Sequence, residues 1–137
     1  MAKRAAKYIS FYLGGILHVF PLLDGAQFIS VDRPTPSLPH NPKVKGLIYH
    51  NGEVVLIVNT ALILGIKAKT EHAVLLFDYQ GDHYGLLLDE GGVVIKSNRV
   101  FSDRQSKDLK KYIKIKKDKV YILEPAFICN QLGLNYD

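Results

Sequence analysis

The run from Val44 to Gly65 constrains the fold of this chain more than any other segment, because it contains signals for two strands, a turn and a helix. Asn51-Gly52 stands between two apolar runs and is a strong β-hairpin signal, since both turn positions need positive φ. The second arm, Val54 to Val58, is apolar throughout, which is typical of a strand buried on both faces. Asn59 or Thr60 then predicts a helix N-cap and Gly65 a helix end.

The same pattern returns from Lys117 to Gly133. Lys117-Asp118 is suited to the turn and Val120 to Leu123 to the strand. Glu124-Pro125 supplies a cap and first helical position, and Gly133 ends the helix. Two copies of one unit, alike in pattern more than in identity, predict an internally duplicated fold.

The rest of the chain also consists of short apolar runs separated by turn signals. Tyr8 to Leu13 and Ile16 to Phe20 flank Gly14-Gly15 and form a predicted hairpin, as do Ala73 to Tyr79 and Tyr84 to Leu88. About nine short strands with little helix are typical of small β-barrels. We therefore expect an all-β fold with short helices.

Four segments, taken in order, share residue types with one family's sequence signatures: YISFYLGG from Tyr8, VKGLIYHNG with the strand and Asn59-Thr60-Ala61 that follow, YGLLLD from Tyr84, and VYILE from Val120. Together they resemble the CheW-like chemotaxis coupling proteins over nearly the whole chain. The resemblance implies a single domain of two packed, SH3-like, five-stranded β-barrels. Their boundary is expected near residue 70, roughly 8–70 and 71–137, with strands that could be exchanged between the halves.

The resemblance also implies a function. CheW-like proteins are cytoplasmic adaptors, without catalysis of their own, that link the regulatory domain of the histidine kinase CheA to the tips of chemoreceptors. Barrel-end surfaces meet the kinase, and a groove between the barrels accepts a receptor helix. The positions of this chain that match the family's motifs, and so are candidate protein-binding residues, are Val44, Gly46, Leu47, Ile48, Gly52, Val54, Gly85, Leu86 and Asp89.

Several of these candidates have an equally good structural interpretation. Gly46 and Gly52 suit a turn or a close backbone approach, and Asp89 suits a hydrogen-bond acceptor. The pattern leaves open whether Val44, Leu47 and Ile48 face the core or a partner.

Two departures from the family pattern concern receptor binding. Asn51 stands where the family has an arginine, and Phe28 aligns with the glutamate that can pair with it. Because both members of the charge pair are replaced, no charge is left unpaired and the fold should survive. Receptor engagement is the property that these departures put in question.

Catalytic and metal-binding patterns are absent from the sequence. The histidines (His18, His40, His50, His72 and His83) are scattered, with no metal-ligand spacing, and there is no phosphate-binding loop or nucleophile elbow. The single cysteine, Cys129, indicates a reducing compartment. No secretory signal or run long enough to span a membrane is present. We expect no enzyme activity, no cofactor and a cytoplasmic location.

The positive charge permits three interpretations. The formal net charge is +5, and seven lysines crowd residues 107–119 beside Tyr112 and Tyr121. These lysines could form a solvated strand face, contact an acidic partner protein, or bind nucleic acid as the alternative function of a basic SH3-like barrel.

Overall fold

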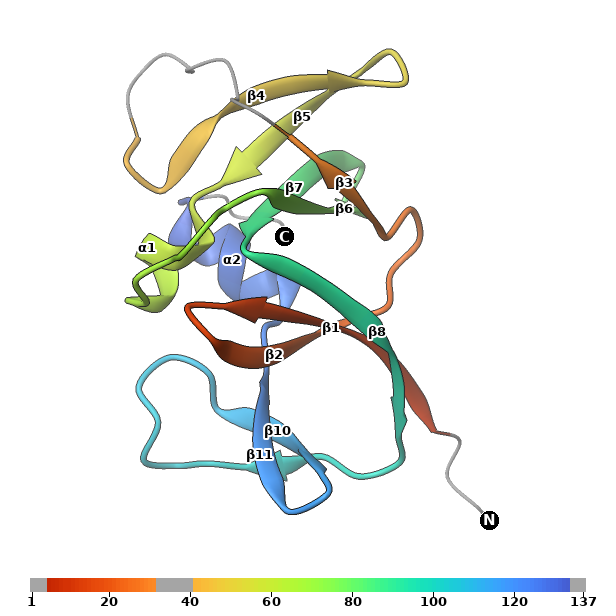
Figure 1. The fold of residues 1–137 in the computed structure, drawn as a ribbon, viewed down its shortest axis with the longest axis vertical. Coiled ribbons are helices and arrows are strands. Elements are labelled where there is room, and N and C mark those ends of the chain that lie inside the picture. Colours follow the sequence, from red (N-terminus) through yellow and green to blue (C-terminus); the bar gives the residue numbers. More distant parts are fainter. Residues whose placement is uncertain (1–4, 32–40, 134–137) are drawn as a thin grey trace.

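The structure, a computed structural model, describes residues 5–31 and 41–133, and its regular elements are mostly strands (Figure 1). The strands are β1 (Ala6–Leu13), β2 (Ile16–Pro21), β3 (Gln27–Ser30), β4 (Val44–His50), β5 (Glu53–Val58), β6 (Ala73–Tyr79), β7 (Asp82–Leu88), β8 (Glu90–Ser97), β9 (Phe101–Ser102), β10 (Lys111–Ile115) and β11 (Asp118–Ile122). Two short helices, α1 (Thr60–Leu64) and α2 (Pro125–Gln131), follow β5 and β11.

These strands form two sheets. Sheet A has the order β8-β1-β2-β11-β10-β9, and sheet B has the order β3-β6-β7-β5-β4. The predicted all-β fold with short helices is confirmed. Sheet A has a sixth strand because the two-residue β9 pairs with the start of β10.

The two sheets repeat one topology, as the duplicated sequence pattern predicts. In sheet B, β4 and β5 form an antiparallel hairpin, α1 follows, and β5 lies parallel to β7. In sheet A, β10 and β11 form the equivalent hairpin, α2 follows, and β11 lies parallel to β2. The outermost strands of each sheet are consecutive in the chain, β3 and β4 in one and β8 and β9 in the other.

The sheets do not divide the chain near residue 70. Sheet B takes the continuous stretch 27–88, whereas sheet A joins β1 and β2 to strands that begin at residue 90. The hairpin–helix unit at the C-terminus needs two more strands to complete its sheet, and the start of the chain supplies them. The division into two subdomains, with strands exchanged between them, stays a prediction.

Local geometry explains the predicted hairpin and helix of sheet B. Asn51 and Gly52 have φ of 51° and 79°, as the tight turn requires. The Asn59 side chain accepts a hydrogen bond from the Leu62 N–H, and Gly65 ends α1 with a φ of 66°. In the C-terminal copy the turn is Lys116-Lys117, one residue before the predicted position.

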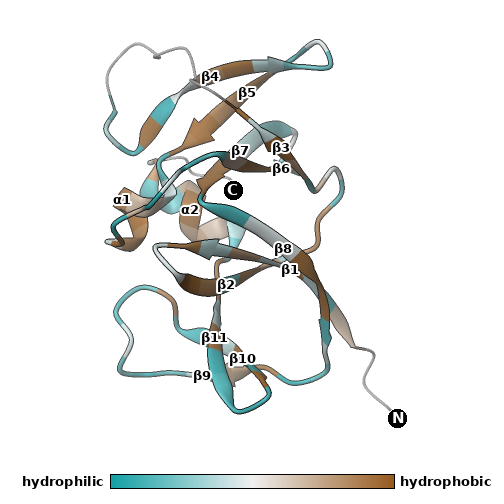
Figure 2. Cartoon of the chain, viewed as in Figure 1, coloured by the Kyte–Doolittle hydropathy of each residue, from teal (hydrophilic) through white to brown (hydrophobic). Residues whose placement is uncertain are grey.

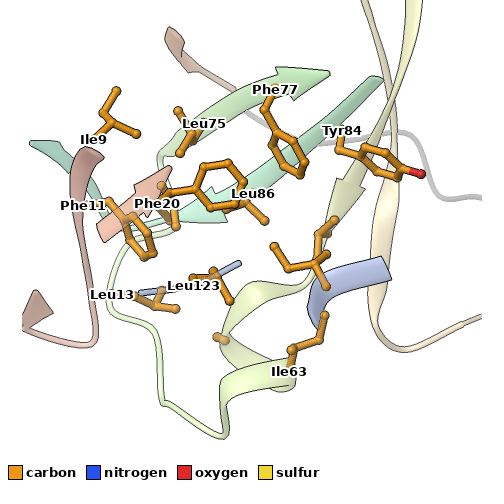
Figure 3. Packing of buried hydrophobic residues seen from close by; sticks show 14 of the residues in the cluster. Ile9, Phe11, Leu13, Phe20, Ile63, Leu75, Phe77, Tyr84, Leu86 and Leu123 are labelled. Atoms are coloured by element: carbon orange, nitrogen blue, oxygen red, sulfur yellow. The ribbon is translucent and has the colours of Figure 1, made fainter. Parts of the chain in front are cut away.

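The main core lies between the sheets (Figure 3). Phe11, Leu13 and Phe20 of sheet A meet Leu75 and Phe77 of sheet B, and the rings of Phe20 and Phe77 lie 4.7 Å apart. Each sheet also encloses a smaller cluster of its own. Figure 2 shows hydrophobic strands joined by hydrophilic turns, in agreement with this packing. Because the central core is shared, the two sheets form one packed unit.

Candidate protein-binding surfaces

The predicted binding residues lie on the β4–β5 hairpin, on β7 and just after β7, and they do not form one surface. Gly46, Gly85 and Leu86 are buried. A Cβ on Gly85 would lie 2.6 Å from Val74 Cγ1 and 2.9 Å from Ile57 Cδ1, so this glycine is needed for close strand packing. These three residues support a surface from below and offer no side chain to a partner.

Strand pairing separates the remaining hairpin residues into two faces. Ile48 pairs with Val55 and packs against the small core of sheet B. Leu47 pairs with Leu56 on the other face. Val44 is half-buried beside a β-bulge that ends at Gly46, whose φ is 154°. Leu47 and Ile48 are both half-buried and lie on opposite faces of the sheet: Ile48 faces the small core of sheet B, and Leu47 lies beside Leu56, which packs against the main core.

Toward the β4–β5 turn, the face of the hairpin that holds Leu47 carries exposed apolar side chains. Tyr49 is 82% exposed and pairs with Val54, which is 47% exposed. Leu47, Val54 and Leu56 line a hollow of about 270 Å³ with Asp82, His83 and Tyr84 of β7. We call Leu47, Tyr49, Val54 and Leu56 the hairpin surface. An exposed apolar patch with a polar rim is typical of protein-binding sites.

Two exposed apolar side chains lie on β8, a strand in which no binding residue was predicted. Val93 is 67% exposed and Val94 is 52% exposed, although they are adjacent in the strand. Successive strand residues point to opposite faces, so both faces of β8 are open here. Among the strands that the structure describes, β8 is an edge strand and pairs with β1 alone. The sequence GGVV of residues 91–94 does not predict this exposure, because exposure depends on which strands cover β8. We call Val93 and Val94 the β8 surface.

β8 begins at the junction of the two sheets. A Cβ on Gly91 would lie 2.8 Å from the ring of Phe28 in β3, so the Phe28 ring rests against the β8 backbone. Phe28 occupies the position of the family's glutamate, and Asn51 lies in the exposed β4–β5 turn. Between them, Gln27 Nε2 lies 3.2 Å from His50 Nε2 and links the two edge strands of sheet B. An aromatic contact and a Gln–His contact thus occupy the region of the expected charge pair.

Asp89 is a structural acceptor, as its alternative interpretation predicts. Its carboxylate accepts hydrogen bonds from the backbone N–H groups of Gly14, Lys69, Thr70 and Glu71, at 2.7 to 2.9 Å. Partial burial would raise the pKa of this carboxyl, but the four N–H donors outweigh it and lower the pKa to about 2. The side chain fastens the β1–β2 turn and the loop before β6 to the end of β7.

His83 lies between two carboxylates at the rim of sheet B. Its Nδ1 is 2.7 Å from Asp78 Oδ1, and its Nε2 is 3.0 Å from Glu53 Oε2. The hydrogen bond with Asp78 raises the pKa of the imidazole, with smaller contributions from the charges of Asp78 and Glu53, against a lowering by burial. Both nitrogens face acceptors, so the protonated ring, with two donors, fits the site best.

Among residues 5–31 and 41–133, no group of three or more His, Cys, Asp and Glu side chains is arranged to hold a metal ion. Within the same residues, no helix has the length and apolar character needed to cross a membrane. His40 lies outside the described residues.

Comparison with known proteins identifies the family. The model of the CheW-like domain matches residues 7–120. The chain belongs to the CheW-like domain family. The CheW scaffolding protein TtCheW from Thermoanaerobacter tengcongensis has the same fold, with a TM-score of 0.79, 16% identity, and coverage of 90% of this chain and 92% of that one. No curated protein sequence matches the chain. The resemblance to CheW-like proteins, including two packed SH3-like units, is confirmed, and membership of this family indicates an adaptor or scaffold role in chemotaxis signalling.

Proposed function

We propose that this CheW-like chain is a non-enzymatic adaptor that couples chemoreceptors to the histidine kinase CheA, in chemotaxis or in motility signalling. The observation that carries the proposal is the pair of separate apolar surfaces, one on each sheet. An adaptor must hold two partners at once, and two non-overlapping patches meet that requirement. The chain would act in the cytoplasm, at the receptor arrays.

The hairpin surface fits the kinase regulatory domain. It lies at the outer edge of sheet B, where β4 is the last strand, and its hollow of about 270 Å³ can accept an apolar side chain from a folded partner. Among the predicted binding residues, Leu47 and Val54 make this contact directly. Gly52 shapes the turn that presents them, and Gly85 and Leu86 are buried in β7 and act through packing.

The β8 surface fits a receptor helix. β8 starts where Phe28 of sheet B touches Gly91, so its valines stand beside the junction of the two sheets. A helix docks in such a place through a row of apolar side chains. Val94 pairs with Ile9 of the core between the sheets, so of the two valines it is the one that faces the junction. Because Asn51 and Phe28 replace the family's charge pair, apolar contact with Val94 would supply most of the receptor affinity here.

Calorimetric titration against the two partners tests the assignment. Val54→Asp should weaken binding to the CheA regulatory domain by roughly tenfold or more, and Val94→Asp should do the same for a receptor-tip fragment. Each variant should leave the other partner's affinity within about a factor of two, because the surfaces are separate. Ile16→Asp is the matched control, since Ile16 is also a strand residue and is 50% exposed.

The two parts of the proposal fail in different ways. No binding of the folded wild-type chain to either partner, at tens of micromolar, would contradict the adaptor function. Binding that is unaffected by Val54→Asp and Val94→Asp would keep the adaptor function and overturn the assignment of surfaces.

A further inference from the structure

The positive charge of the chain is concentrated in residues 96–119. This stretch holds ten of the 18 Lys and Arg residues and three of the 13 Asp and Glu residues, so the rest of the chain has eight basic residues against ten acidic ones. In Figure 2 the β10–β11 hairpin of this stretch carries hydrophilic residues and lies at the end of the molecule opposite β4 and β5. A one-sided charge of this kind indicates a negatively charged partner.

The cations of this stretch are poorly neutralised within the molecule. Of the ion pairs between described residues, one involves them, with Lys111 Nζ 3.9 Å from Glu124 Oε1. Lys114 lies directly opposite Lys119 in the β10–β11 pairing. Like charges placed opposite each other destabilise a sheet. A partner that brings negative charge to this hairpin would relieve the repulsion.

Aromatic rings hold several of these cations in place. The Arg99 guanidinium lies 5.1 Å and the Lys114 ammonium 4.7 Å from the centre of the Phe101 ring, and the Lys119 ammonium lies 5.1 Å from that of Tyr112. Phe101 and Tyr112 also stack on each other, 5.3 Å apart. We call these five residues the basic face. Its rings are occupied by cations and by each other, which removes the open ring faces that single-stranded nucleic acid needs for base stacking.

An apolar cleft lies near the start of β10, on the opposite face of the strand from the basic face. Val100 and Lys111, the chain neighbours of Phe101 and Tyr112, line a cleft of about 420 Å³. Its other walls include Tyr8, Ile122 and Pro125. A pocket of this size and lining suits a large apolar side chain. A phosphate backbone has no such group to place there, whereas a polypeptide does.

We propose that the basic face and this cleft bind an acidic polypeptide segment that carries one large apolar side chain. The acidic residues contact Arg99, Lys114 and Lys119 on one face of β10, and the segment then passes around the start of this strand, so that the apolar side chain enters the cleft beside Val100 and Lys111. The five-residue strands β10 and β11 would lie beside about five residues of an extended segment. The hairpin turn, Lys116-Lys117, presents no apolar side chain that would insert into a membrane. This site is independent of the coupling role, because neither surface assigned to that role includes these residues.

Fluorescence anisotropy with defined probes tests the proposal. The probe is a labelled ten-residue peptide of Glu and Asp with one central Phe, and the comparison probes are the same peptide with Ser for Phe and an oligothymidylate of equal charge. At about 50 mM salt we expect the Phe peptide to bind tightest, and its affinity to fall roughly tenfold or more at about 500 mM salt. The Ser peptide should bind at least about threefold more weakly, because the cleft then stays empty.

Charge reversal locates the site. Lys114→Glu with Lys119→Glu should weaken peptide binding by roughly tenfold or more, whereas Lys45→Glu with Lys67→Glu, an equal charge change at exposed positions in and beside sheet B, should leave it within about a factor of two. If thermal unfolding shows that the charge-reversed variant does not fold, the neutral variant Lys114→Gln with Lys119→Gln takes its place.

Four outcomes would overturn the inference. The oligonucleotide could bind as tightly as the Phe peptide, which would favour nucleic acid. The Ser peptide could bind equally well, so that the cleft is unused. The control variant could lose as much affinity as the basic-face variant. Sedimentation could show salt-sensitive self-association through the basic face, which would make the partner a second copy of the chain. Each result can be read whether or not the chain binds CheA.

Discussion

The ring of Phe28 in β3 rests against Gly91 in β8, so closely that a Cβ on Gly91 would lie 2.8 Å from the ring. This contact joins the edge strands of two different sheets at the place where the receptor helix is proposed to dock. Gly91 has no positive φ, so a substitution there tests space and not backbone strain.

Gly91→Val should therefore destabilise the chain by overpacking, by about 1 to 3 kcal/mol. Urea unfolding, monitored by circular dichroism, measures the change in the free energy of unfolding. Combining it with Phe28→Ala, which removes the ring, should recover part of the loss. Glu90→Val, at the exposed neighbouring position, is the control and should change stability little. A Gly91→Val chain as stable as the wild type would show that Phe28 moves away freely.

Asp89→Asn should destabilise the chain at neutral pH, because an amide gives the four N–H donors a weaker acceptor. The carboxyl pKa is about 2 in the folded chain against 3.8 for the ordinary group. A shift of this size corresponds to about 2 kcal/mol, and because solvent screens this partly exposed carboxylate we expect a loss of about 1 kcal/mol. A lowered pKa stabilises above the unfolded value, so the contribution is complete above pH 4 to 5 and is lost as the pH falls toward 2. The gap between wild type and Asp89→Asn should close over that range in acid unfolding curves. A difference in unfolding free energy that stays constant with pH would contradict the role of the Asp89 carboxylate as acceptor of the four N–H groups.

His83 should titrate above its ordinary pKa of 6.5, because Asp78 and Glu53 hold its protonated form. A raised pKa stabilises below the unfolded value, so this small contribution is present at pH 6 and is lost as the pH rises through the folded pKa. NMR titration of the imidazole checks the direction. Asp78→Asn should lower the pKa more than Glu53→Gln, since the Asp78 hydrogen bond is the main cause. If the pKa of His83 is the same in the wild type, Asp78→Asn and Glu53→Gln, the proposed contacts of His83 with Asp78 and Glu53 are ruled out.

Gly85→Ala should destabilise the chain by about 1 to 3 kcal/mol, because the new methyl group meets Val74 and Ile57 in the small core of sheet B. Val74→Ala should make room for it, so the double variant should be less destabilised than the sum of the single changes. Thermal unfolding gives the comparison. At temperatures where Gly85→Ala remains folded, affinity for the CheA regulatory domain should stay close to that of the wild type, since Gly85 lies beneath the hairpin surface. A large loss of affinity in the folded variant would place Gly85 in contact with the kinase.

The elements that could be predicted from the sequence are those with strong local signals. Asn51-Gly52 and Gly14-Gly15 fixed two hairpins, and Asn59 with Gly65 bounded α1, because turn and cap geometry depend on the residues at those positions. The duplicated unit at the C-terminus was recognisable for the same reason. The predicted β10–β11 turn lies one residue after the observed one, because Lys116 has a positive φ of 60° without being Gly or Asn.

Features that depend on distant strands could not be predicted in the same way. The exposure of Val93 and Val94 follows from β8 being an edge strand, and the opposite orientations of Leu47 and Ile48 follow from the bulge at Gly46 and from the pairing with β5. The basic segment was visible in the sequence. Its aromatic supports became apparent only when β9 paired with β10 and brought Phe101 beside Tyr112.

The joining of β1 and β2 to β11 also has a consequence for biosynthesis. Residues 27–88 can assemble into sheet B while the ribosome is still translating the remainder, since that sheet is contiguous in the chain. The first two strands have to wait for residues 118–122 to emerge before they gain their parallel neighbour. Until then the apolar side of β1 and β2 is without its full cover, and it is this early-made hairpin that a nascent-chain chaperone would protect.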